Sequence, residues 1–246
     1  MLTSTFCPTL SCCSLTAFIA IVDTILFIVT VSIGLYKEGQ FLEVQTQTLL
    51  DFGASYSPYI YHGQVYRLVA PIILHGYFMH YLGNVATTLI LVSRVEYTFG
   101  WFKTLVIYVL SGIFANIFSA LIDPGPVKIG ASTSLYGIIG VIIGYLIINW
   151  DGIDGVGKIM KCQIYCSAMM IIVFTILFTS SSAGSGIDYW GHFGGFLAGL
   201  WLSFIHNTIV SNTREKIIRI VFACLLVIQV LTCFLVFYLQ PNPSYA

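Results

Sequence analysis

The feature that most constrains this chain is a series of long apolar runs separated by short segments of charged and turn-forming residues. A helix needs roughly 20 apolar residues to cross a hydrocarbon core about 30 Å thick. The runs predict seven membrane spans, at approximately residues 15–35, 77–95, 102–122, 129–149, 160–180, 188–207 and 217–239. Hydrophobic residues make up 58% of the sequence and charged residues 8%, a balance that excludes an ordinary soluble domain. We therefore expect an all-α, polytopic transmembrane helical bundle.

The breaks between the runs give the expected organisation. Residues 1–14 form a short tail, residues 15–207 a six-helix core, and residues 208–246 a loop with an additional C-terminal transmembrane helix. The core includes a long first loop, 36–76, with several tyrosines. Two readings of this loop stay open: amphipathic pieces lying at the membrane interface, or an ordinary extramembrane loop.

The distribution of basic residues predicts the orientation. The loops after the even-numbered spans hold seven Lys and Arg residues, and the odd loops hold three: Arg94, Lys103, Lys158, Lys161, Arg214, Lys216 and Arg219 against Lys37, Arg67 and Lys128. By the positive-inside rule, the N-terminus is cytosolic. We expect the plasma membrane or a secretory-pathway membrane. The tail cysteines Cys7, Cys12 and Cys13 are either palmitoylated or plain thiols.

The formal net charge of +0 offers no basic surface for nucleic acid, so the expected partners are the lipid bilayer and membrane proteins. No metal or cofactor is called for.

Ionisable side chains inside spans are costly and ask for a functional or pairing explanation. The ionisable residues in the spans are Asp23, His80, Arg94, Glu96 and His192. Three neutral polar residues lie in the same spans: Asn84, Ser132 and Ser134. His80, Ser132 and His192 all fall within about one turn of the non-cytosolic starts of spans two, four and six. We expect Glu96 and Arg94 to cap and anchor the second span, and Asp23 to interact with another span.

Ser132 and His192 are the pair that nucleophilic catalysis requires, because a serine hydroxyl attacks poorly until a neighbouring imidazole accepts its proton. Asp188 precedes His192 by one turn but lies at the loop edge, where an acid favours the positive end of the helix dipole. A Ser-His dyad is therefore predicted rather than a triad.

Two further side chains are candidate oxyanion donors. His80 and Asn84 are four residues apart, which places them on one helical face; taken alone, such a pair more often joins neighbouring helices. Tyr136, one turn after Ser132, is placed to pack its ring against the imidazole. A ridge of glycines in the sixth span is predicted to seat against glycines of the fourth: Gly191, Gly195 and Gly199 against Gly137, Gly140 and Gly144.

From about Tyr66 to Gly199 the chain resembles the rhomboid proteases. Four segments carry the resemblance, in the order Tyr66-Arg67, the run His75 to Asn84, Gly130-Ala-Ser132-Thr and His192-Phe-Gly-Gly. They are similar to the family's Trp-Arg, HxxxxHxxxN, GxSG and AHxxG motifs. The resemblance implies a rhomboid-like fold, Ser132 as nucleophile, His192 as base, His80 and Asn84 in the oxyanion hole, and Gly130 and His75 in support. The extra C-terminal span resembles the eukaryotic arrangement.

One residue departs from the motif, because Thr133 stands where the family has glycine. If the active conformation needed glycine-only dihedrals there, the protein would be an inactive relative. Ser134 is an alternative nucleophile, but it is turned roughly 200° around the helix from Ser132.

The expected function is an intramembrane serine endopeptidase that cleaves single-span membrane proteins near their non-cytosolic end. Two other classes remain: an inactive rhomboid-like protein that binds membrane clients, and a transporter or channel.

Overall fold

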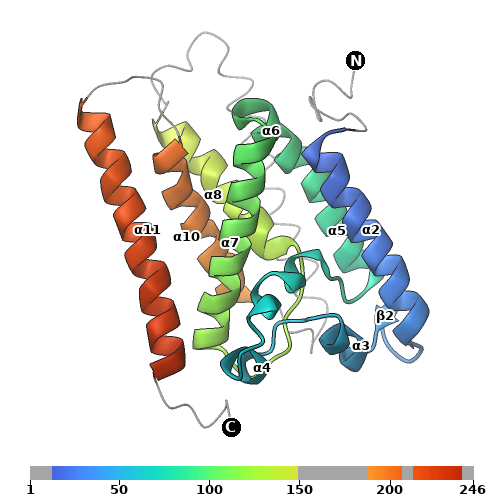
Figure 1. Cartoon of the computed structure of the whole chain (residues 1–246). Coiled ribbons are helices and arrows are strands. Elements are labelled where there is room, and N and C mark those ends of the chain that lie inside the picture. The colour runs from blue at the N-terminus through green and yellow to red at the C-terminus, as the bar shows by residue number, and fades with distance from the viewer. Residues whose placement is uncertain (1–12, 149–187, 207–212, 240–246) are drawn as a thin grey trace, which may run out of the picture.

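A computed structural model describes residues 13–148, 188–206 and 213–239 of the chain. Its long helices lie side by side, with α2 (Leu15–Gly34) at one edge of the bundle and α11 (Thr213–Leu239) at the opposite edge (Figure 1). Between them lie α7 (Trp101–Ile122), α8 (Ser132–Ile148) and α10 (Tyr189–His206). The described helices follow the predicted apolar runs closely.

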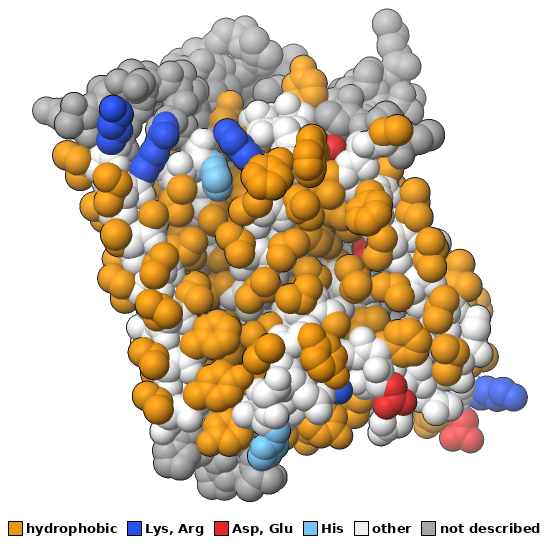
Figure 2. All heavy atoms as spheres, viewed as in Figure 1, with side chains coloured by type: hydrophobic (Ala, Val, Ile, Leu, Met, Phe, Trp, Pro, Cys, Tyr) orange, Lys and Arg blue, Asp and Glu red, His pale blue; other side chains and the backbone are white. Residues whose placement is uncertain are grey.

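Three described helices are long and apolar enough to cross a membrane: α2, α7 and the Arg219–Leu239 part of α11. The shorter apolar α8 has 17 residues. Hydrophobic side chains cover the flanks of the bundle, as in a protein surrounded by lipid, whereas Lys and Arg side chains gather mainly at its upper end (Figure 2). The predicted fifth span, 160–180, lies outside the described residues.

The second span is longer than the sequence predicted. It runs without a break through α5 (Phe78–Thr87), a π-helical turn η3 (Thr88–Val92) and α6 (Ser93–Phe99), and it ends at Gly100, whose φ is +82°. The prediction ended it at residue 95, before a polar stretch, but α6 continues for one more turn.

Glu96 caps the first helix rather than its own, which the sequence did not predict. Its Oε1 accepts a hydrogen bond from Leu15 N (2.8 Å), and its Oε2 accepts from Thr16 N (2.9 Å) and Thr16 Oγ1 (2.7 Å). The first amides of a helix have no partner within the helix, and a carboxylate satisfies them and favours the helix dipole. Glu96 thus joins the start of α2 to α6.

Asp23 is fully buried, and neither of its carboxylate oxygens has a hydrogen-bond partner among the described residues. Its carboxylate interacts electrostatically with Tyr108 of α7, so Asp23 does interact with another span, although not through a hydrogen bond among the described residues. Elsewhere on α2, Thr24 hydrogen-bonds the Tyr81 hydroxyl (2.9 Å) and Phe27 stacks on the Tyr81 ring. These contacts fix α2 against α5.

The long first loop is folded into short helices, strands and 3-10 turns. Its elements are β1 (Leu35–Tyr36), β2 (Glu43–Val44), α3 (Thr46–Asp51), α4 (Ser57–Tyr61) and the 3-10 turns η1 (Val65–Leu68) and η2 (Ala70–Ile73). The two strands pair antiparallel, with Leu35 opposite Val44. Arg67 holds the loop together, because its Nη1 donates to the carbonyls of Leu50 (2.7 Å) and Ala54 (3.0 Å).

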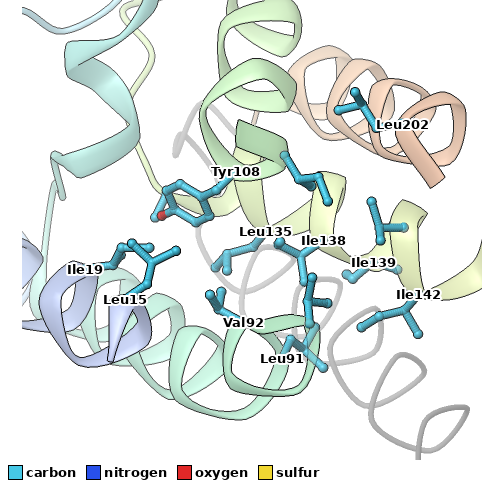
Figure 3. Close-up of a cluster of buried hydrophobic side chains, with 14 of the residues drawn as sticks. Leu15, Ile19, Leu91, Val92, Tyr108, Leu135, Ile138, Ile139, Ile142 and Leu202 are labelled. Atoms are coloured by element: carbon cyan, nitrogen blue, oxygen red, sulfur yellow. The ribbon is translucent and has the colours of Figure 1, made fainter. Parts of the chain in front are cut away.

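The largest buried cluster of apolar side chains surrounds α8, which packs against α7, α10 and η3. Leu135, Ile138 and Ile139 of α8 lie at its centre, with Leu91 and Val92 of η3 beside them (Figure 3). Because α8 begins with Ser132, this packing also fixes the position of Ser132 in the bundle.

Backbone contact between α8 and α10 requires glycine. A Cβ at Gly199 would overlap the carbonyl oxygen of Gly137, and one at Gly140 would overlap the carbonyl of Phe196. The predicted glycine ridge is therefore present from Gly195 onwards. The prediction was wrong for Gly191, since its nearest neighbour is the carboxylate of Asp188 rather than α8.

Candidate active site

Ser132 and His192 meet at the starts of two helices. Ser132 is the first residue of α8, three residues later than the predicted start of that span, and His192 is in the first turn of α10. The His192 Nε2 lies 2.8 Å from the Ser132 Oγ. This distance allows the imidazole to take the hydroxyl proton, provided that the Nδ1 carries the ring's other proton. Both residues are half-buried.

Tyr136 packs against the imidazole as predicted. Its ring is stacked on that of His192, with 4.3 Å between centroids and 10° between planes. Tyr136 lies one turn along α8 from Ser132, so a single helix carries both the hydroxyl that bonds the imidazole and the ring that supports it. The stack restricts rotation of the His192 ring.

His80 lies next to Gly130, two residues before Ser132. A Cβ at Gly130 would stand 2.7 Å from His80 Nε2 and 3.3 Å from Ser132 Oγ, so the His80 ring and the Ser132 hydroxyl both border the bare Gly130. Gly130 has a φ of +126°, which L side chains rarely adopt, and its N–H donates to the Pro71 carbonyl (2.9 Å). The positive φ and the close approach of the His80 ring explain why this position is glycine.

His75 and Asn84 complete the predicted group. The buried His75 ring contacts the His80 ring edge-on, at 5.4 Å between centroids. Asn84 follows His80 by one turn of α5, and its buried Nδ2 has no hydrogen-bond partner among the described residues. The Asn84 amide thus has unused donor capacity close to His80.

Ser134 and Thr133 do not take part in this cluster. Ser134 is fully buried and faces Gly112 of α7, away from His192. Thr133 is helical, and Leu42 alone among the described non-glycine residues has a positive φ. Thr133 is thus the second residue of α8 and does not need dihedrals that only glycine adopts. The positive φ in this segment belongs to Gly130 instead.

Asp188 is a helix N-terminal acid, as expected, but its partners are not evident from the sequence. Its Oδ1 accepts from Gly191 N (2.8 Å) and from the Ser119 hydroxyl, and Lys128 Nζ lies 4.0 Å away. Among the described residues no carboxylate hydrogen-bonds the His192 ring. The sequence gives one signal, Lys128 in the short loop between two predicted spans. Taken alone, however, a lysine in a loop indicates nothing more than a solvated charge.

These observations first define a class: a helical membrane protein in which a serine and a histidine from different helices form a hydrogen bond near one end of the bundle. Comparison with known proteins then gives the family. Residues 62–209 match the rhomboid domain, and the chain belongs to the rhomboid family.

Several curated relatives are named as proteases. Rhomboid-like protease 3 of Toxoplasma gondii is 34% identical over 180 residues, which is 73% of this chain and 66% of the relative. Rhomboid-like protease 1 of the same organism is 32% identical over 202 residues, 81% of this chain and 66% of the relative. RHOMBOID-like protein 5 of Arabidopsis thaliana is 33% identical over 171 residues, 69% of this chain and 53% of the relative. The chain thus spans about two thirds of the Toxoplasma relatives and about half of the Arabidopsis protein.

Proposed function

We propose that this protein is an intramembrane serine endopeptidase that works through a Ser132–His192 dyad. The observation that carries the proposal is the 2.8 Å separation of Ser132 Oγ and His192 Nε2, contributed by two different helices. A nucleophile within hydrogen-bond distance of a base is the arrangement that covalent catalysis requires.

In the proposed reaction, His192 Nε2 accepts the proton of Ser132 as Oγ attacks the scissile carbonyl carbon. The tetrahedral intermediate carries its negative charge on the former carbonyl oxygen, to which His80 and Asn84 donate hydrogen bonds. His192 then passes the proton to the leaving amine, and the peptide bond breaks to give an acyl-enzyme on Ser132. Water, deprotonated by the same imidazole, releases the second product and restores the serine.

The substrates are single-span proteins in the surrounding bilayer. An intact helix hides its carbonyls in its own hydrogen bonds, so the cleaved segment carries helix-weakening residues near its non-cytosolic end. The site lies at the starts of α5, α8 and α10, and its partial exposure gives water and an unwound segment a route to Ser132.

The proposed topology has seven spans and a cytosolic N-terminus, in the plasma membrane or a secretory-pathway membrane. Its support is the basic end of the bundle. Lys103 and Lys216 lie near the starts of α7 and α11, at the end opposite the Ser132–His192 pair.

An inactive, client-binding relative is the second candidate, and Thr133 is the residue that favours it. The helical dihedrals of Thr133 weigh against that reading, because nothing at this position requires glycine. Retention of the serine, the histidine and both oxyanion candidates weighs against it further.

The test is cleavage of a panel of single-span proteins with helix-weakening segments, reconstituted with the enzyme in the same vesicles. Wild type and Ser134→Ala are expected to cut, since Ser134 faces away from the site, and Ser132→Ala and His192→Ala are expected to be inactive. Unchanged cutting by Ser132→Ala would refute the assignment.

A further inference from the structure

Lys128 is a buried cation in the loop between α7 and α8, only 4% exposed. Its Nζ donates to the Ser119 carbonyl (3.0 Å), the Ser119 hydroxyl (2.7 Å) and the Asp123 carbonyl. Its backbone pairs with Ser55 of the first loop through two hydrogen bonds of 2.9 Å. One residue thus connects the end of α7 with the first loop, four positions before Ser132.

Asp188 lies just before α10, four positions before His192, as Lys128 lies four positions before Ser132. Its main-chain carbonyl accepts from His192 N (2.9 Å), and its Oδ1 accepts from Gly191 N (2.8 Å). The same Oδ1 accepts from the Ser119 hydroxyl and lies 4.0 Å from Lys128 Nζ. The Asp188 carboxylate therefore fixes the backbone next to His192, and Lys128 and Ser119 fix that carboxylate.

The charges of Lys128 and Asp188 make each of these two buried residues depend on the other. Burial lowers the pKa of Lys128, and the carboxylates of Asp188 and Asp123 oppose that shift. Removing one member of a buried pair leaves the other charge uncompensated, so the remaining partner moves or takes up water. Asp123 is the weaker partner although its carboxylate is nearer, at 3.7 Å, because its side chain is 46% exposed and therefore screened by solvent.

We propose that Lys128 and Asp188 are positioning residues for the dyad: together they fix the start of α10 against the loop that leads into α8, and so set the distance from His192 to Ser132. The inference rests on the proposed function for its kinetic consequence. The geometric consequence does not depend on catalysis.

The kinetic experiment measures kcat and KM for wild type, Lys128→Met, Asp188→Asn, the double variant and the control Asp123→Asn, all normalised to folded protein. A small misplacement of reacting groups costs about 100-fold, so we expect Lys128→Met to lower kcat about 100-fold with KM within about threefold. Asp188→Asn keeps an acceptor for Gly191 N and should lose only about tenfold, since Asn caps helices as well as Asp.

The double variant should be no slower than Lys128→Met alone, because the two single losses share one interaction. Lys128→Arg, which keeps the positive charge, should recover part of the activity. Asp123→Asn should stay within about twofold of wild type, as expected of an exposed pair. Losses that multiply in the double variant, or a kcat unchanged in Lys128→Met, would overturn the proposal.

Hydrogen exchange separates this inference from the protease proposal. Exchange of the Gly191 and His192 amides needs no substrate, and losing a helix cap is worth about 1 kcal/mol, or roughly fivefold in opening. Lys128→Met and Asp188→Ala should raise this exchange at least that much, and Asp123→Asn should not. If wild type cuts nothing but the exchange rises, the protease proposal alone fails; if the exchange is unchanged, the positioning role fails.

Discussion

The rings of Tyr136 and His192 lie flat on each other, 4.3 Å apart and 10° from parallel. Because Tyr136 and Ser132 belong to the same helix, α8 contacts the imidazole twice: at its face through the phenol ring and at its Nε2 through the hydroxyl. Two contacts from one rigid element fix both the plane and the direction of the base.

The stack should be measurable in reactivity. An aromatic pair is worth about 0.5–1.5 kcal/mol, so Tyr136→Leu should slow fluorophosphonate labelling of Ser132 by about tenfold. Tyr136→Phe keeps the ring and should label within about threefold of wild type. A Leu variant that labels as fast as the Phe variant would show that the stack does not orient His192.

Asn84 should contribute to the reaction and not merely to packing. Removing one oxyanion donor costs about 100- to 1,000-fold in kcat, so Asn84→Ala should lose about 100-fold while KM changes little. Asn116→Ala is the matched control: its Nδ2 donates to the Leu68 carbonyl (2.9 Å), away from the site. That variant should lose stability, by about 1–3 kcal/mol, yet keep its kcat. Equal kcat losses in both variants would remove Asn84 from the oxyanion hole.

The contact between α8 and α10 should tolerate no side chain at Gly199. A methyl group there would overlap the Gly137 carbonyl, and overpacking typically costs about 1–3 kcal/mol. We expect Gly199→Ala to lower the thermal midpoint in detergent by several degrees and to lower cleavage with it. Gly125→Ala is the control, because no atom lies within 4 Å of a Cβ there. A fully stable, fully active Gly199→Ala would contradict the close approach.

Glu96 should stabilise the fold without affecting catalysis. Hydrogen bonds to charged groups contribute about 1.5–3 kcal/mol, so Glu96→Ala should lower the free energy of unfolding by at least about 2 kcal/mol. The exposed Glu38 serves as control, and Glu38→Ala should change that energy by less than about 0.5 kcal/mol. Thermal unfolding followed by tryptophan fluorescence measures both. An unchanged midpoint for Glu96→Ala would show that the cap of α2 is dispensable.

The spans that the sequence predicted best are those set by apolar length alone. Residues 15–35 and 102–122 match α2 and α7 within one residue at either end, because length and hydropathy are local properties. The end of the second span depended on a distant contact. Glu96 is stable inside α6 since it binds the amides of Leu15 and Thr16, which are about 80 residues away in the chain.

The first loop could not be predicted in detail for a similar reason. Its helices are only five or six residues long, too short to show a period, and Arg67 holds them through carbonyls of Leu50 and Ala54. Carbonyl acceptors leave no trace in the side-chain pattern.

The candidate site was largely predictable, because chemistry-bearing residues are rare in apolar helices. Ser132, His192, His80 and Asn84 stand out by residue type alone, and helical spacing placed Tyr136 beside the base. Lys128 and Asp188 did not stand out, since each lies at a loop edge and they are 60 positions apart. Only the folded chain brings them within 4.0 Å.

The central claim is that His192 activates Ser132 within the membrane. The most direct measurement is covalent labelling of the folded, reconstituted protein by a fluorophosphonate, with the modified residue located by mass spectrometry. Wild type is expected to carry the label on Ser132, Ser132→Ala none, and His192→Ala at least about 100-fold less, in line with the loss of a general base. Labelling of Ser132 at an unchanged rate in His192→Ala, or no labelling of the folded wild type, would contradict it.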